Sequence, residues 1–206
     1  MELRNASEGG GSNVMDLLVM VEWVWCQIVL THRGFQRTLI LVGGAISSGY
    51  TASVIAPWLE RTLTPPTSPA FRWALAQVQT NAVPAGAIHN YVPPLAAATG
   101  QNTSMWIASH VLLSILYVLI TLSIFSVFVT VAMLRETLWD IPNMPVTRLQ
   151  SVALHVLATA ASTYLTVIFV VLVGNLAWLK DFAWIAEETA HSLAVTYVGH
   201  IVALVL

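Results

Sequence analysis

Glu22 is the residue whose position could most directly carry chemistry, because its carboxylate lies inside an apolar run. The run covers residues 14–30, with Trp23 and Trp25 close to the carboxylate. A charged group near the middle of a membrane costs about 3 kcal/mol on insertion scales, so we expect Glu22 to face other helices or to be protonated. Two roles remain open: a proton or cation site, or a protonated or hydrogen-bonded group that ties helices together.

Histidines offer two further arrangements, and neither favours a metal or haem. His110 and His155 each lie about five residues after the start of an expected helix. In antiparallel helices they would occupy opposite leaflets, about 15 Å or more apart at 1.5 Å per residue, which is too far for one iron. Glu188 and His191 are one turn apart but supply only two ligands. With no Ser-His-Asp set and no phosphate-binding glycine loop either, we expect no catalytic residue, no metal and no cofactor.

The composition indicates a membrane protein. Of the 206 residues, 57% are hydrophobic and only 9% are charged, and the mean hydropathy is +0.75, whereas an average soluble domain has about 25% charged residues. The net charge of −2 provides no basic surface for nucleic acid. We therefore expect an all-α polytopic protein that contacts the lipid bilayer and binds no DNA or RNA.

Four runs are long enough to cross a hydrocarbon core of about 30 Å, which takes about 20 helical residues. They cover approximately residues 14–30, 38–58, 105–134 and 151–178. The polar residues 1–13 contain three consecutive glycines and predict a flexible tail, so that residues 14–206 form a single membrane domain.

Two segments outside the spans have their own character. Prolines interrupt residues 59–104, which predicts a long loop, although residues 71–78 are mildly amphipathic and could lie along the membrane interface. Residues 182–206 have a polar first half, which predicts a C-terminal helix lying in the interface or packed back on the bundle.

Arginines predict the orientation. Arg33 and Arg37 lie in the turn between the first two spans, and Arg135 and Arg148 flank the turn between the last two. Short loops that carry Lys and Arg stay on the cytoplasmic side. Both turns are therefore expected in the cytoplasm, and both termini and the loop 59–104 outside.

Small residues follow one another at four-residue spacing in the second span. Gly43 pairs with Ser47, Gly44 with Ser48 and Ala45 with Gly49 in this small-xxx-small pattern. Small residues on one helix face let two backbones approach closely in lipid. We expect a helix-packing face here, the alternative being a pore lining or a gating hinge.

Several segments, in their order along the chain, resemble the colicin V production protein family of bacterial inner-membrane proteins. The similar segments are MDLL at 15–18, RGF at 33–35, APWL at 56–59, IPNMPV at 141–146 and HSLAVTYVGH at 191–200. The resemblance implies a multi-pass inner-membrane protein needed for the production or export of a secreted peptide toxin, without an assigned enzymatic activity.

Little polar chemistry lines the four runs, which favours a non-enzymatic accessory protein. It would act through association with itself or with partner membrane proteins, in toxin secretion or envelope maintenance. The alternative is a small channel or transporter in which Glu22, Ser47 and Ser48 line a pathway, with Thr163 and Thr166 as further members.

Overall fold

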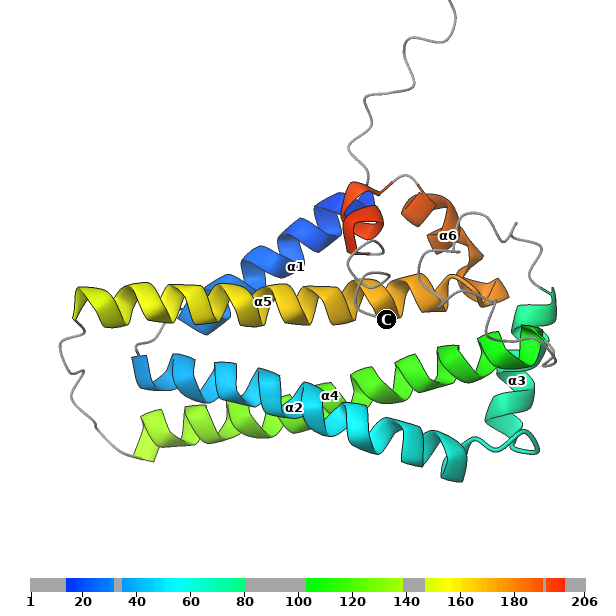
Figure 1. Ribbon diagram of the computed structural model, residues 1–206, viewed down its shortest axis with the longest axis horizontal. Coiled ribbons are helices and arrows are strands. Elements are labelled where there is room, and N and C mark those ends of the chain that lie inside the picture. The colour runs from blue at the N-terminus through cyan, green and yellow to red at the C-terminus, as the bar shows by residue number, and fades with distance from the viewer. Residues whose placement is uncertain (1–13, 32–34, 81–102, 139–146, 191, 199–206) are drawn as a thin grey trace, which may run out of the picture.

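The computed structural model describes residues 14–31, 35–80, 103–138, 147–190 and 192–198, and over these residues it contains helices and turns but no strand (Figure 1). The elements are α1 (Val14–Thr31), α2 (Phe35–Leu63), α3 (Pro69–Thr80), α4 (Thr103–Leu138), α5 (Arg148–Leu176), the 3-10 helix η3 (Lys180–Phe182) and α6 (Ala183–Ala190). Residues 193–198 form a further short helix. Four of these helices, α1, α2, α4 and α5, are long and apolar enough to cross a membrane. The expected all-α architecture with four candidate spans is confirmed.

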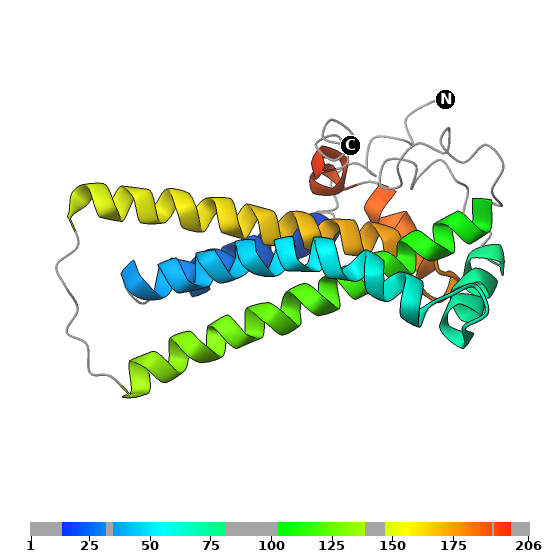
Figure 2. The same ribbon diagram turned by 60° about the horizontal axis from the view of Figure 1, so that its bottom comes forward.

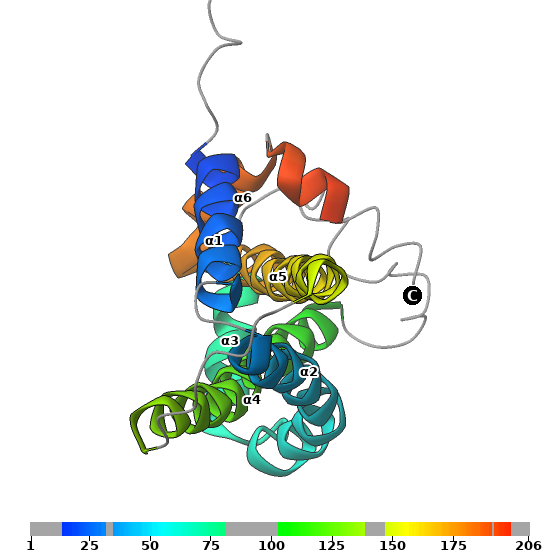
Figure 3. The ribbon, with the colours of Figure 1, turned by 90° about the vertical axis from the view of Figure 1, so that its left-hand side faces the viewer.

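The four long helices form two pairs. Viewed along the long axis, α1 lies beside α5, and α2 lies beside α4 (Figure 3). The ends of α1 and α4 and the beginnings of α2 and α5 lie at one end of the bundle, while α3 packs against α4 at the other (Figures 1 and 2). The two turns that carry arginines therefore join helices at the same end.

The long helices begin and end within five residues of the expected spans. The start of α5 is set by a capping box: Gln150 N donates to Thr147 Oγ1 at 3.3 Å, and Thr147 N donates to Gln150 Oε1 at 3.0 Å. These two bonds satisfy amides that have no partner inside the helix.

The expected loop 59–104 contains a helix. The last turn of α2 continues to Leu63, and α3 follows after a short turn. Ser68 caps α3, since its Oγ accepts from Phe71 N at 3.1 Å, and Pro69 occupies the first helical position, where its missing N–H costs nothing. Phe71 and Val78 are buried on the face of α3 that packs against α4. The prolines here begin a helix as well as ending one.

The C-terminal segment differs from the single helix expected over 182–206. It consists of η3 and α6, followed by a separate helix at 193–198. Ser192 starts that second helix, because its Oγ accepts from Val195 N at 3.2 Å. Val195 and Val198 are buried in the same apolar cluster as Met15 of α1. Over its described residues, the segment therefore packs back on the bundle. Residues 199–206 and the expected tail 1–13 lie outside the described residues.

Candidate functional site

The carboxylate of Glu22 lies between α1 and α5, and both of its oxygens accept hydrogen bonds. Thr166 Oγ1 of α5 donates to Oε2 at 2.5 Å, and Cys26 Sγ donates to Oε1 from the next turn of α1 at 3.1 Å. Beside them, Trp23 Nε1 donates to Thr163 Oγ1 at 3.4 Å. We call these five residues the α1–α5 polar seam.

The seam follows from helical geometry. Thr163 and Thr166 are three residues apart and so share one face of α5, and each meets one of two consecutive residues of α1. A carboxylate in an apolar setting is tolerated when its oxygens are hydrogen-bonded. The seam therefore accommodates Glu22 and fixes the register of α1 on α5.

Ser47 and Ser48 do not join this seam. Ser48 is fully buried and donates to Ala45 O of its own helix at 2.9 Å, and Ser47 is exposed. Of the residues expected to line a pathway, the structure brings only the two threonines of α5 to the helix that carries Glu22.

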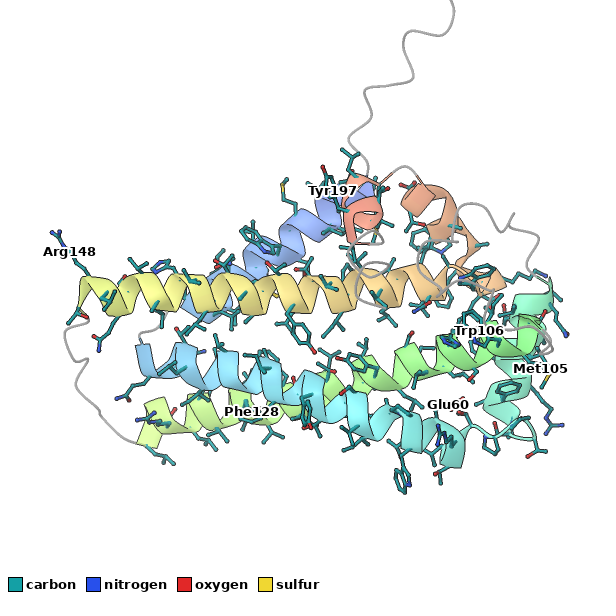
Figure 4. The ribbon with its side chains drawn as sticks, in the orientation of Figure 1. Glu60, Met105, Trp106, Phe128, Arg148 and Tyr197 are labelled. Atoms are coloured by element: carbon teal, nitrogen blue, oxygen red, sulfur yellow. The ribbon has the colours of Figure 1, made fainter. Side chains whose placement is uncertain are left out.

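The glycines of α2 differ in their surroundings. A Cβ added at Gly44 would lie 2.6 Å from both Cβ and Cγ of Phe128 on α4, and one at Gly49 would overlap Tyr164 Oη on α5. A Cβ at Gly43 would have nothing within 4 Å. Figure 4 shows Phe128 at the crossing of α2 and α4. Gly44 and Gly49 are therefore sites of close approach, whereas Gly43 faces outward.

Two tyrosines meet at Gly49. Tyr117 Oη donates to Gly49 O at 3.2 Å, and the hydroxyls of Tyr117 and Tyr164 are 2.9 Å apart. They line an apolar cavity of about 470 Å³ together with residues of α2 and α5 such as Ile46 and Leu157. Sequence reasoning missed this pair, although an interior glycine such as Gly49 is a signal of close approach.

Two more side-chain bonds join helices. Asn175 Nδ2 of α5 donates to Ser114 Oγ of α4 at 2.6 Å, and Ser109 Oγ of α4 donates to Glu60 Oε1 of α2 at 2.7 Å. Glu60 lies towards the α3 end of the bundle (Figure 4). Neither bond was anticipated, because each depends on the register between helices far apart in sequence.

The histidines bond locally. His110 Nδ1 lies 3.0 Å from Trp106 O, and His155 Nδ1 lies 2.7 Å from Ser151 O, each one turn earlier in its own helix. Among the described residues there is no group of three or more His, Cys, Asp or Glu side chains that could hold a metal ion. His191 lies outside the described residues.

Arg37, Arg135 and Arg148 lie at the end of the bundle where α1 and α4 end and α2 and α5 begin (Figure 1). Arg135 Nη2 donates to Gln36 Oε1 at 2.6 Å, which links α4 to the start of α2. Arg148 begins α5 at the same end (Figure 4), and Arg37 lies in the first turn of α2. Arg33 is outside the described residues.

Neither a family model nor a curated protein nor a solved structure matches this chain. Its class is therefore defined by its own architecture. Over the residues that the structure describes it is all-helical, with four helices long and apolar enough to cross a membrane, and polar side chains form hydrogen bonds between these helices.

Proposed function

We propose that this chain is a non-enzymatic membrane protein that acts through helix–helix association. Its partners would be copies of itself or other membrane proteins of a bacterial inner membrane, and its role would lie in secretion or envelope maintenance. The observation that supports this proposal is that several polar side chains within the spans form hydrogen bonds between helices.

Three such contacts join different pairs of elements. Glu22 accepts from Thr166 between α1 and α5, Asn175 donates to Ser114 between α5 and α4, and Tyr117 donates to the backbone of α2. Bonds of this kind between membrane helices contribute about 0.6 kcal/mol on average. Polar groups engaged in this way stabilise a bundle whose exposed apolar side chains, such as Leu119, Leu122 and Val127 of α4, can contact other membrane helices.

The sequence resemblance adds a narrower proposal. If the chain acts as the colicin V production family does, its association supports production or export of a peptide toxin. In this proposal the end that carries Arg37, Arg135 and Arg148 faces the cytoplasm, because clustered arginines are retained there.

One observation favours a second candidate, a small channel or transporter. Glu22 is a half-buried carboxylate near the middle of α1, and two threonine hydroxyls of α5 lie along the same seam. Carboxylates inside spans often mark ion or proton paths. In this alternative, the Glu22 carboxylate would bind and release the transported proton or cation.

Substitution of Glu22 separates the two candidates. Glu22→Gln removes the charge but keeps an oxygen that can accept from Thr166, whereas Glu22→Ala removes both hydrogen bonds. The association proposal predicts no proton or cation flux by the wild-type protein in liposomes, near-normal assembly of Glu22→Gln, and weakened assembly of Glu22→Ala in mild detergent.

Flux by the wild-type protein that disappears in Glu22→Gln, with assembly intact, would instead support transport. Glu60→Gln is the matched control, since Glu60 also accepts a hydrogen bond from another helix but lies near the end of α2. It is expected to leave flux unchanged in either case.

A further inference from the structure

Asp16, near the start of α1, holds the beginning of the last described helix. Its Oδ1 accepts from Ser192 Oγ at 2.6 Å and from Ala194 N at 3.0 Å, and its Oδ2 accepts from Leu193 N at 3.3 Å. Residues 176 to 178 positions apart in the chain thus meet at one carboxylate.

The three hydrogen bonds complete the cap of the helix at 193–198. The first amides of any helix lack partners within it. Here Leu193 N and Ala194 N donate to Asp16, and Val195 N donates to Ser192 Oγ. A negative side chain at a helix N-terminus is also favoured by the helix dipole. The carboxylate of Asp16 therefore serves a helix to which it does not belong.

This helix lies beside the start of α1. Where α1 begins, the helix at 193–198 adds Val195 and Val198 to the apolar cluster that contains Met15 and Val19. Tyr197 of this helix is exposed (Figure 4). The short helix thus packs against the first turns of α1.

We propose that Asp16 and residues 192–198 form a clasp, closed in this structure, whose opening is controlled by the Asp16 carboxylate. Val195, Val198 and the Asp16 carboxylate attach the clasp to the start of α1. Leu193 and Tyr197 are 69% and 71% exposed and contribute little to its packing. Loss of the carboxylate releases the clasp and uncovers the first turns of α1. Glu22 and Trp23 still hold the middle of that helix on α5.

Thiol labelling tests the clasp. In a Cys26→Ala background, which removes the chain's single cysteine, Val195→Cys places a thiol at a position that is 1% exposed, and Leu193→Cys places one at a position that is 69% exposed. The thiol at 195 is expected to react slowly with a water-soluble maleimide. Adding Asp16→Ala is expected to raise its rate about tenfold, and the thiol at 193 to react fast throughout.

Two further variants make the result decisive. Asp181→Ala is the matched control, because Asp181 also accepts a side-chain hydrogen bond from another element, from Gln77 Nε2 at 2.8 Å, but does not touch the clasp. It should leave labelling at 195 unchanged. Ser192→Ala, which removes one donor to Asp16 and the cap of Val195, should raise the rate as Asp16→Ala does.

A thiol placed by Ala158→Cys, fully buried in the other apolar cluster, reports unfolding of the bundle as a whole and should stay slow in every variant. The clasp is overturned if labelling at 195 is already fast with Asp16 present. It is equally overturned if Asp16→Ala leaves the rate at 195 unchanged, or raises it only together with the rate at 158.

Discussion

Gly44→Ala is expected to disturb the contact between α2 and α4 that organises half of the bundle. The added methyl would lie 2.6 Å from both Cβ and Cγ of Phe128. These atoms are at the root of the side chain, close to the backbone of α4, so rotation of the ring cannot clear them. The two helices must move apart, or α4 must shift along α2.

The magnitude can be estimated from a matched pair of glycines. Overpacking of this kind costs about 1–3 kcal/mol, and alanine recovers about 1 kcal/mol of helix propensity. Gly43→Ala gains the same propensity with nothing within 4 Å of the new methyl. The free energies of unfolding of the two variants should therefore differ by about 1–3 kcal/mol, with Gly44→Ala the less stable.

Reversible unfolding in mixed micelles, with increasing mole fraction of a denaturing detergent and helical circular dichroism as the signal, measures this difference. Gly49→Ala belongs in the same series. Its methyl would overlap Tyr164 Oη, but that hydroxyl is the far end of a side chain that can turn away. Its cost should therefore be smaller than that of Gly44→Ala. Equal stability of Gly43→Ala and Gly44→Ala would refute the close approach of α2 and α4.

Two further substitutions test single contacts in the same unfolding assay. Tyr117→Phe removes the hydrogen bonds to both Gly49 O and Tyr164 Oη, so it should lower the free energy of unfolding by about 1 kcal/mol. Tyr164→Phe removes only one of these bonds and should cost less. The reverse order would contradict the assigned geometry. Asn175→Ala removes the hydrogen bond to Ser114 between α5 and α4 and should lower the free energy of unfolding by about 1–2 kcal/mol. Ser114→Ala should cost less, because the larger amide of Asn175 stays free to turn towards other groups. No loss of stability in Asn175→Ala would show that this bond does not hold the helices together.

Local patterns in the sequence were enough to predict the four long helices. Each of these helices corresponds to an apolar run long enough to cross a membrane. Helix ends follow local signals, such as the capping box of Thr147 and Gln150 at the start of α5. The start of α3 carries an equally local signal, Ser68 followed by Pro69. It was overlooked because prolines were interpreted only as helix breakers, although proline is favoured at the first position of a helix.

The partners of individual side chains could not be predicted in the same way. The cost of a carboxylate in lipid predicts that Glu22 faces another helix. Its contact with Thr166, 144 positions away in the chain, depends on the register between α1 and α5. The same holds for Asp16 and Ser192, which are 176 positions apart. Periodicity gives the face of a helix, and only packing gives the residue opposite.

Native mass spectrometry of the protein purified in mild detergent tests the central claim most directly. If association is the function, the protein should form a defined complex, either with further copies of the chain or with a second membrane protein in a fixed ratio. Glu22→Ala should lower the amount of this complex. A wild-type protein that is monomeric and free of protein partners under conditions that preserve its fold would contradict the claim.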